Sequence, residues 1–516
     1  MMWPHNPIKK IAILGAGASG TTLFFNLVEQ TIQACCADQL EIIVIERSGR
    51  FGPGLAYSTN ISLNLMNTPT FDLGILYGHK SHFWDWLVAN EAFWRVHFPE
   101  MGHYNRDTPL PRKLYGLYLE TLFYNTEKKA RQAGISVKLI VDDVIDIEKQ
   151  QGMYSLQFIK QSALTADVLV SCVGLGKVSK YPDLRRMPGY LLFPGEEEAS
   201  ILEIPQHENV AILGSRLSAI DSILLLNHVK RTGHTFVASR TANMPNVIWK
   251  HARYACRYLT KEHLLLVTHQ AQKPLNLRQL VSLMKKEYFF QEGRRLQLQS
   301  LLYPRHDPIV KFRHDIIKTS GKIRPWQAAF YSTNSIVNFA WNLLSDKDKL
   351  AFQKYYSRIF QNQRIAMPID NAKKIFSLYK NKVLSFHKQL SQVDYHHNKF
   401  HLFFDDHPSP ITVKYLIDAA GLAGMANQVS NQLIKNLLNQ KLICLDEFGF
   451  IHVDPYTMRI INPIDKEENF YVLGGLTQGT YIAANLMESI VELSNQITQS
   501  ITGSLRLDKS LKREIS

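Results

Sequence analysis

The sequence has few cysteines, no long apolar run and no segment typical of export. Its apolar runs stay below the roughly 18–20 residues that a membrane-spanning helix needs. The first strand-like stretch begins at Ile11, which leaves no room for a signal peptide. The five cysteines, at positions 35, 36, 172, 256 and 444, show neither metal-ligand spacing nor a disulfide framework. We therefore expect a cytoplasmic protein without a metal site and without a membrane partner.

The sequence also lacks a recognisable catalytic triad. None of its 19 histidines stands at a spacing that selects it as a base, and the adjacent His396 and His397 lie in a polar, loop-like stretch. Catalytic residues are therefore not assigned from the sequence. A protein whose chemistry is carried by a cofactor needs no such triad.

Acidic residues are scarce in one part of the chain. Over residues 230–324, 19 Lys and Arg stand against 5 Asp and Glu, so this segment carries the whole net charge of +14. A basic segment attracts acidic substrates, nucleic acid or anionic membranes. It is also typical of a solvated helical face beside a nucleotide site, which is the interpretation that we favour. Nucleic acid is not an expected partner, although the basic segment does not exclude it.

A glycine turn between a strand and a helix is the most informative stretch. Residues 11–14 suit a buried strand, and Gly15, Gly17 and Gly20 follow on the G-x-G-x-x-G spacing, with Ser19 in the same turn. Gly15 permits a tight turn, Gly17 lets backbone approach a pyrophosphate, and Gly20 lets helix and strand pack closely. The amides at the start of the helix bind phosphate.

A second strand, EIIVIE, ends on Glu46, the usual position of a carboxylate that binds a ribose hydroxyl. Glu46 lies 26 residues after Gly20. The usual spacing is about 20, so we expect an extended first helix or exit loop. Strand, glycine turn, helix, strand and acid in this order predict a dinucleotide site.

Further stretches occur in the same order in one protein family. They are the acid–arginine pair Glu46–Arg47, then GPGLAYST, LMNTP, PRKLYGLYL and the strand end VSCVGLG. With the glycine turn, they make the chain resemble the FAD/NAD(P)-binding flavoprotein family that includes flavin-dependent urate hydroxylase. Some related bacterial flavoproteins oxidise amino groups. The resemblance is good over 10–185, moderate over 205–226 and 440–495, and loose across the middle. It implies FAD contacts from Gly15, Gly17, Gly20, Glu46, Arg47, Asn67 and Arg112.

A second strand–turn–helix follows at 209–227. Related flavoproteins usually have glycine at the third position of this turn, whereas this chain has Gly214, then Arg216 and Ser218. The Arg216 side chain either crowds an approaching pyrophosphate or pairs with its phosphates through the guanidinium group. We expect a Rossmann unit here that takes NADPH or NADH, and the nicotinamide site stays open.

The C-terminal glycines complete the expected flavin site. Residues 471–473 suit a strand, and Gly474, Gly475 and Gly479 precede a helix expected to begin near Thr480. In flavoproteins that this chain resembles, the corresponding turn faces the flavin. A plain helix start is the alternative.

We expect an α/β fold with two Rossmann-like dinucleotide-binding units, of FAD and NAD(P) type, and a helical insertion. No internal sequence repeat is evident, and Asn276 and Ser345 are expected N-caps of two inserted helices. The expected parts are an FAD-binding domain over 1–190, a second Rossmann unit over 205–250, a basic helical region over 251–375, return strands over 376–435, the C-terminal part of the FAD domain over 436–502 and a polar, frayed tail over 503–516.

The resemblance favours an FAD-dependent oxidoreductase. The expected activity is that of an NAD(P)H-using monooxygenase, which hydroxylates a small nucleophilic molecule with molecular oxygen through a flavin hydroperoxide. An oxidase or dehydrogenase on the same fold is the nearest variant. A flavin-binding protein without turnover and a flavoenzyme acting on RNA are the alternatives, the first suggested by Arg216 and the second by the basic segment.

Overall fold

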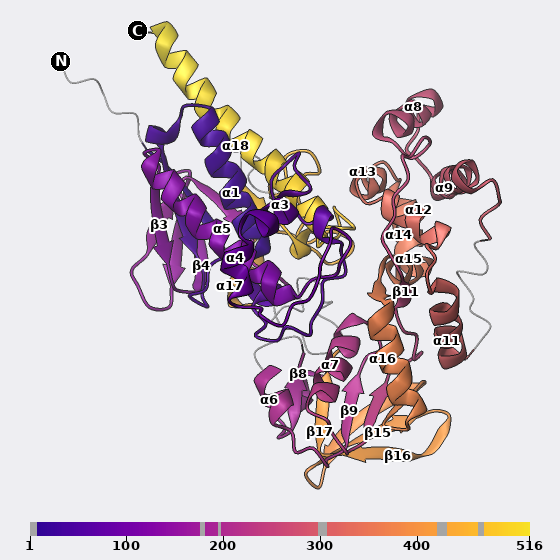
Figure 1. Ribbon diagram of the computed structural model, residues 1–516. Helices are drawn as coiled ribbons and strands as arrows, with labels where there is room; N and C mark the ends of the chain where they lie inside the picture. Colours follow the sequence, from indigo (N-terminus) through magenta and orange to yellow (C-terminus); the bar gives the residue numbers. More distant parts are fainter. Residues whose placement is uncertain are drawn as a thin grey trace. The chain divides into compact units, whose positions relative to one another are not determined.

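In the computed structural model the chain forms two compact units (Figure 1). Unit 1 contains residues 1–62, 69–176 and 424–516, and unit 2 contains residues 63–68 and 177–423. The structure describes residues 8–175, 181–193, 198–297, 307–420, 431–462 and 469–515.

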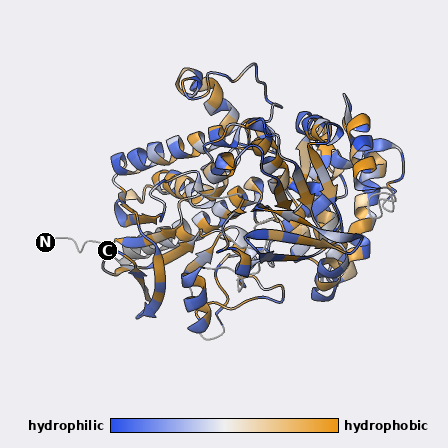
Figure 2. Cartoon of the chain, turned by 90° about the horizontal axis from the view of Figure 1, so that it is seen from below, coloured by the Kyte–Doolittle hydropathy of each residue, from blue (hydrophilic) through white to orange (hydrophobic). Residues whose placement is uncertain are grey.

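Unit 1 is built on a parallel five-stranded sheet in the order β18-β7-β1-β2-β3. Its strands are β1 (Lys9–Leu14), β2 (Leu40–Ile45), β3 (Ser136–Ile140), β7 (Val168–Ser171) and β18 (Phe470–Val472). The strands are mostly hydrophobic, whereas the helices show both colours along their length (Figure 2). Such continuous apolar runs are typical of parallel strands whose two faces are both covered.

Helices and a small antiparallel sheet surround this core. Helix α1 (Ala18–Gln33) packs against α5 (Arg112–Gln132) and α18 (Met487–Ile515). Between β3 and β7 the chain forms an antiparallel meander of β4 (Val144–Gln150), β5 (Met153–Phe158) and β6 (Leu164–Ala166), and α17 (Gln432–Asn439) packs on β4. The shorter helices of unit 1 are η1 (Ala37–Gln39), α2 (Gly54–Tyr57), η2 (Thr70–Asp72), α3 (His82–Ala89), α4 (Glu91–Arg95) and η5 (Gly475–Thr477).

Unit 2 contains a second parallel five-stranded sheet, in the order β13-β10-β9-β17-β8. Its strands are β8 (Tyr190–Leu192), β9 (Val210–Leu213), β10 (Thr235–Ala238), β13 (Leu384–His387) and β17 (Tyr415–Asp418). Helix α7 (Leu217–His228) packs on β9, and α16 (Ile369–Lys380) packs on α7 and β13. The segment before β9 forms η3 (Pro182–Leu184) and α6 (Glu198–Glu203).

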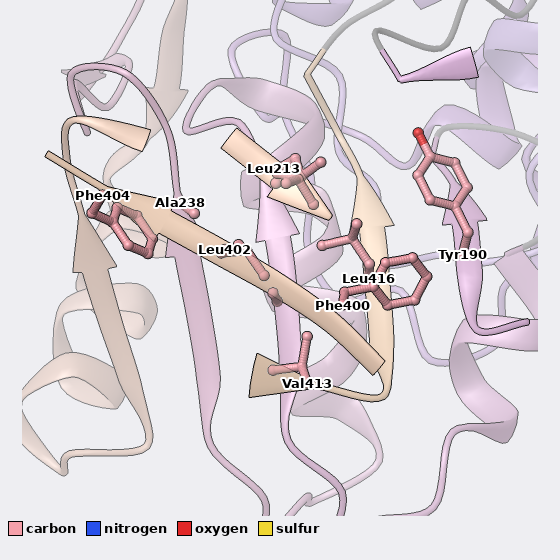
Figure 3. Close-up of a cluster of buried hydrophobic side chains, with 10 residues drawn as sticks. Tyr190, Leu213, Ala238, Phe400, Leu402, Phe404, Val413 and Leu416 are labelled. Atoms are coloured by element: carbon pink, nitrogen blue, oxygen red, sulfur yellow. The ribbon is translucent and has the colours of Figure 1, made fainter. Parts of the chain in front are cut away.

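An antiparallel meander covers one face of this second sheet. It consists of β14 (Leu390–His396), β15 (Lys399–Phe404) and β16 (His407–Val413). Its Phe400 and Leu402 are fully buried in a cluster that also contains Leu213 and Leu416 of the sheet. Figure 3 shows these side chains between the meander and the parallel strands. The meander and the sheet therefore share one hydrophobic core.

The two units repeat one topology although the sequence shows no repeat. In each, a glycine turn joins the central strand to a helix, the next strand pairs on one side, and a meander precedes the strand on the other side. Thus β9, β10, β13 and β17 occupy the positions of β1, β2, β3 and β7. The fifth strand differs in origin: β18 comes from the end of the chain and β8 from the segment before β9.

A helical region is inserted between β11 (Asn246–Ile248) and β12 (Ala366–Pro368), which pair in parallel. It contains α8 (Lys261–Ala271), α9 (Leu277–Glu292), α11 (Pro308–Thr319), α12 (Pro325–Ser332), α13 (Val337–Asn342), α14 (Asp346–Tyr355) and α15 (Ser357–Arg364). Both expected N-caps are confirmed. The Asn276 side chain accepts a hydrogen bond from the amide of Gln279 at 2.9 Å, and Ser345 Oγ accepts one from the amide of Asp348 at 3.2 Å.

The C-terminal part differs from the sequence prediction. Helix α18 begins at Met487 rather than near Thr480, because residues after η5 bond to the preceding loop instead. The Tyr481 hydroxyl donates to the carbonyl of Pro455 at 3.0 Å, for example. The tail expected to be frayed continues α18 to Ile515. Over the described residues, no helix is both long and apolar enough to cross a membrane.

Candidate dinucleotide-binding sites

The turn between β1 and α1 requires its glycines for steric reasons. Gly15 has φ +95°, and a Cβ on Gly20 would lie 1.9 Å from the carbonyl oxygen of Gly15. The amide of Gly15 donates to the carbonyl of Ile45 at the end of β2 at 2.8 Å. Helix α1 has neither a side-chain cap nor an acidic residue in its first turn. Its first amides, which include that of Ser19, are therefore suited to an anion.

Glu46 lies against this turn, as a ribose-binding carboxylate should. Its Oε2 accepts a hydrogen bond from the amide of Ala16 at 2.9 Å, and its Oε1 accepts one from the amide of Ser48 at 3.0 Å. The carboxylate is thereby held beside the glycine turn at the end of β2. Arg47 follows it on the exposed surface.

The GPG loop (residues 52–54) packs on the same turn. A Cβ on Gly54 would lie 2.6 Å from the Cα of Gly17, so two backbone segments meet where both residues lack a side chain. In this structure the close approach that Gly17 permits is to this loop. Gly116 of α5 fixes the other side, since a Cβ there would lie 2.2 Å from the carbonyl oxygen of Tyr57. Burial raises the pKa of Tyr57, and the nearby Arg112 guanidinium lowers it.

The end of β18 also reaches the glycine turn. Gly474 has φ +105°, and a Cβ on it would lie 3.2 Å from Ser19 Oγ. Gly479 packs on Asp446, since a Cβ there would lie 1.7 Å from a carboxylate oxygen of that residue. Burial raises the pKa of Asp446, although amides of the following loop donate to it. Gly475 begins η5 and packs on Asn485.

Three segments therefore converge on residues 15–20: the end of β2, the GPG loop and the end of β18. They bring together most of the flavin-site residues that the sequence predicts in unit 1, with Arg112 reaching this group through Tyr57. Asn67 is different, because residues 63–68 belong to unit 2. Gly52, Gly54 and Gly116 were not predicted as site residues, although their steric role here is as strict as that of Gly20.

The turn between β9 and α7 repeats this geometry. Gly214 has φ +105°, its amide donates to the carbonyl of Ala238 at 2.9 Å, and a Cβ on it would lie 2.5 Å from the carbonyl oxygen of Ala419. Arg216 occupies the N-cap position of α7, and its Nη1 donates to Gln361 Oε1 of α15 at 3.2 Å. Ser218 lies in the first helical turn. The arginine side chain thus extends from the turn to the helical region.

Sequence reasoning missed Ser239 and Arg240, which follow β10 where Glu46 and Arg47 follow β2. Ser239 Oγ donates to Ser215 Oγ at 3.2 Å and accepts from the amide of Ala242 at 2.8 Å. Like Glu46, Ser239 thus bonds to the second residue of its glycine turn and to an amide of its own loop, but it donates to the turn where Glu46 accepts, and it carries no charge. The signal was present, because Ser239 lies 20 residues after Ala219, the counterpart of Gly20.

A cavity of about 240 Å³ opens at the carboxyl ends of β10 and β13. Its charged and titratable lining residues are His387, Lys388 and His407 together with the carboxylates Asp307 and Asp406, and Ala242 and Tyr379 also line it. Burial lowers the pKa of His387, and the neighbouring His407 and His234 lower it further. The carboxyl ends of parallel strands are the usual place for ligands in open α/β sheets. This cavity lies beside Ser239 and Arg240 in sequence, since Ala242 is part of its wall.

Comparison with known proteins agrees with this geometry. Residues 12–176 match the model of an FAD-NAD(P)-binding family. This segment holds β1, α1, β2, the GPG loop and β7. No curated protein matches the chain.

Solved structures of similar fold span nearly the whole chain. An L-lysine 6-monooxygenase from Pseudomonas syringae has a TM-score of 0.56 at 13% identity, covering 95% of this chain and 98% of its own. An ornithine N-hydroxylase from Kutzneria sp. 744, solved with reduced FAD, NADP⁺ and L-ornithine, has a TM-score of 0.56 at 14% identity, covering 98% and 100%. A cadaverine monooxygenase from Erwinia amylovora bound to FAD has a TM-score of 0.54 at 15% identity, covering 96% and 95%.

These likenesses establish the fold. The predicted α/β architecture with two Rossmann-like units and an inserted helical region is confirmed. The expected cofactor class, FAD with NAD(P), is that of the matched family.

Proposed function

We propose that this chain is an FAD-dependent, NADPH-using monooxygenase that hydroxylates the amino group of a small molecule. One observation carries the proposal: two complete Rossmann units, each with its own glycine turn, on a fold shared with amine monooxygenases over nearly the full length of both chains. A fold alone fixes no substrate. The proposal therefore also rests on the residues of the two turns. The cytoplasmic setting remains a prediction.

Unit 1 fits FAD. The strained Gly15, the uncapped start of α1 and the carboxylate of Glu46 supply a tight turn, phosphate-binding amides and a ribose partner in one place. We assign the pyrophosphate to the turn formed by Gly15, Gly17, Ser19 and Gly20. Arg47, Arg112, Gly474, Gly475 and Gly479 are further proposed FAD contacts. When bound, FAD supplies the oxygen-activating redox chemistry.

Unit 2 fits NADPH better than NADH. An acidic residue after the second strand binds the ribose hydroxyls of NADH, whereas an arginine there accommodates the 2′-phosphate of NADPH. This chain has the neutral Ser239 followed by the exposed Arg240 at that position. We assign the 2′-phosphate to Arg240 and the adenosine end to the cavity lined by His387 and Lys388. Gly214, Arg216 and Ser218 would hold the pyrophosphate, with Arg216 pairing with phosphate in place of Gln361.

The first experiment follows the flavin absorbance of the purified protein without oxygen. Addition of NADPH should bleach the flavin bands, and NADH should do so more slowly. With oxygen admitted, NADPH consumption should then rise with lysine, ornithine or cadaverine and yield a hydroxylamine. Urate, a substrate of one member of the family that the sequence resembles, is the comparison. A yellow protein that neither nucleotide bleaches, with or without these amines, would instead be a flavin-binding protein without turnover.

The nicotinamide preference has its own test. Arg240→Ser should raise the KM for NADPH about tenfold, the loss of roughly one charged hydrogen bond, and leave the KM for NADH unchanged. Arg186→Ser is the matched control, because Arg186 is another exposed arginine of unit 2. An unchanged KM for NADPH in the Arg240 variant would remove Arg240 from the 2′-phosphate site.

A further inference from the structure

The end of α9 exposes two aromatic side chains between two pairs of cations. Phe289 is 53% exposed and Phe290 is 50% exposed. The flanking cations, all exposed, are Lys285, Lys286, Arg294 and Arg295. These six residues are called the Phe289 patch. Adjacent large apolar side chains on a charged surface mark a contact surface rather than a solvated helix face.

The two acidic residues of α9 are bonded to the protein rather than fully exposed beside this patch. Glu287 is fully buried, and its Oε2 accepts the amides of the consecutive residues 257–259 at 2.8, 2.6 and 3.2 Å. Glu292 accepts a hydrogen bond from the Tyr254 hydroxyl. Its other oxygen lies 3.9 Å from Nη2 of Arg294, so this carboxylate offsets part of one cation's charge. With four exposed cations against this one partly exposed acid, the patch keeps a net positive charge.

The apolar surface extends toward α8. The Arg257 guanidinium lies 5.1 Å from the ring centre of Phe290. Tyr258 contacts both Phe290, at 6.2 Å, and His263 in the first turn of α8, at 5.8 Å. Leu265 and Leu266 of α8 are each 50% exposed. In Figure 1, α8 and α9 lie at the end of the helical region away from the parallel sheet of unit 2.

We propose that the Phe289 patch docks unit 2 onto an anionic lipid surface. Phenylalanine and leucine side chains enter the boundary between headgroups and acyl chains, while lysine and arginine bind the anionic headgroups. A contact of this kind needs no membrane-spanning helix, and it revises the expectation that the protein has no membrane partner. It is independent of the proposed function, because the patch contains none of the residues assigned to either dinucleotide.

Charge and side-chain type favour this partner over two others. A second copy of the chain in a two-fold contact would place like-charged pairs against each other, which is unfavourable. Single-stranded RNA would be attracted by the cations and could stack on phenylalanine. The neighbouring leucines have no ring on which a base can stack, but they do partition into lipid.

Sedimentation with vesicles tests the proposal on the full-length protein. We expect binding to vesicles of equimolar phosphatidylcholine and phosphatidylglycerol, weak binding to phosphatidylcholine alone, and weaker binding as salt rises. Removing both lysines by Lys285→Gln and Lys286→Gln should lower the partition coefficient about 25-fold, at about 1 kcal/mol per cation. Phe289→Ser with Phe290→Ser should lower it about tenfold or more and leave the salt dependence unchanged, since these changes remove no charge.

Phe93→Ser is the matched control, because Phe93 is 45% exposed on unit 1 and lies outside the patch. It should leave vesicle binding unchanged, and unaltered thermal unfolding of every variant excludes misfolding as the cause of a loss. The proposal is overturned if the wild-type protein does not sediment with the anionic vesicles. It is also overturned if the patch variants sediment as well as wild type. Salt-sensitive binding to a labelled uridine oligonucleotide, or patch-dependent dimers in analytical ultracentrifugation, without vesicle binding would assign the patch to those partners instead.

Discussion

At the scale of single residues, steric exclusion decides the first dinucleotide site. Gly20 is needed not for its flexibility, since its φ is ordinary, but because the carbonyl of Gly15 occupies the space of a Cβ. Gly15 is needed for its left-handed backbone. Two glycines of one motif are thus required for different physical reasons. If space were available, Gly20 could be replaced without backbone strain, whereas Gly15 could not.

Gly20→Ala should lower the free energy of unfolding of unit 1 by about 2–3 kcal/mol, a typical cost of overpacking. It should also weaken FAD binding, because α1 must move away from the turn. Thermal unfolding and flavin fluorescence measure the two effects. Gly102→Ala is the control, since a Cβ at Gly102 meets nothing within 4 Å. Equal behaviour of the two variants would contradict the steric argument.

A residue-scale pH dependence follows from His82. Its Nδ1 lies 2.7 Å from the Tyr118 hydroxyl. Burial lowers the pKa of His82 below the ordinary 6.5, and the neighbouring His79 lowers it further. Asp85 and Glu29 raise it, but by less. The unfolded chain then binds more protons than the folded one below pH 6.5, so stability is present above that pH and is lost as pH falls. Between about pH 7.5 and about pH 5.5, we expect the unfolding temperature of His82→Gln to fall by less than that of the wild-type protein. Parallel losses in the two proteins would mean that His82 does not contribute.

At the scale of elements, α5 holds the GPG loop in place. Gly116 lets the helix approach Tyr57 closely, and Tyr115 adds an edge-on ring contact with Tyr57 at 4.9 Å. The loop in turn reaches Gly17 through Gly54. A helix that starts more than 90 residues after the glycine turn therefore determines the shape of that turn's surroundings.

The Gly116→Ala variant tests whether close packing or helix propensity dominates at this position. Alanine in place of glycine inside a helix stabilises it by about 0.5–1 kcal/mol. At Gly116 the new Cβ would meet the carbonyl of Tyr57, so we expect a lower unfolding temperature and weaker FAD binding instead. Gly503→Ala in α18 is the matched control, because a Cβ there meets nothing within 4 Å and should only stabilise. A stabilised Gly116→Ala variant would show that α2 and α5 separate at little cost.

At the scale of the whole molecule, the chain is a duplicated topology whose two copies differ in charge at the residue after the second strand, Glu46 in the first and Ser239 in the second. The first copy bonds its glycine turn to Glu46 and the second to Ser239. In the proposed assignment, the same backbone design binds FAD in the first copy and NADPH in the second. The inserted helical region belongs to the second copy and contains most of the segment 230–324, whose cations outnumber its acids, whereas cations and acids balance in the rest of the chain.

Amide hydrogen exchange should show which dinucleotide binds to which of the two units. FAD should slow amide exchange over 15–20 and around Gly54, and NADP⁺ should slow it over 214–219 and at 239–242, because a bound ligand stabilises the segments that it contacts. Mass spectrometry of the peptides from each unit measures this. Protection by NADP⁺ confined to unit 1 would contradict the assignment of one dinucleotide to each unit.

Much of this organisation could be predicted from the sequence because it is encoded locally. Strand, glycine turn and helix are contiguous, so Gly15, Gly20 and Gly214 were found by spacing. The cap Asn276 was found from the helical pattern that follows it, and Ser345 from Asp348 three residues on. The start of α18 was misplaced because residues after η5 are held by a distant loop. The residue pattern of one segment does not show which distant residues that segment will contact in the fold.

The sequence by itself determined the two strand–glycine–helix units and the excess of cations in the inserted region, since both follow from residue type and short spacing. Tertiary structure decided what meets each turn: Gly54 against Gly17, Gly474 against Ser19, and Ser239 against Ser215. It also revealed that the two units share one topology, and it buried Glu287 of α9 while leaving Lys285 and Lys286 exposed. These outcomes depend on contacts between segments far apart in the chain, which only the packed fold brings together.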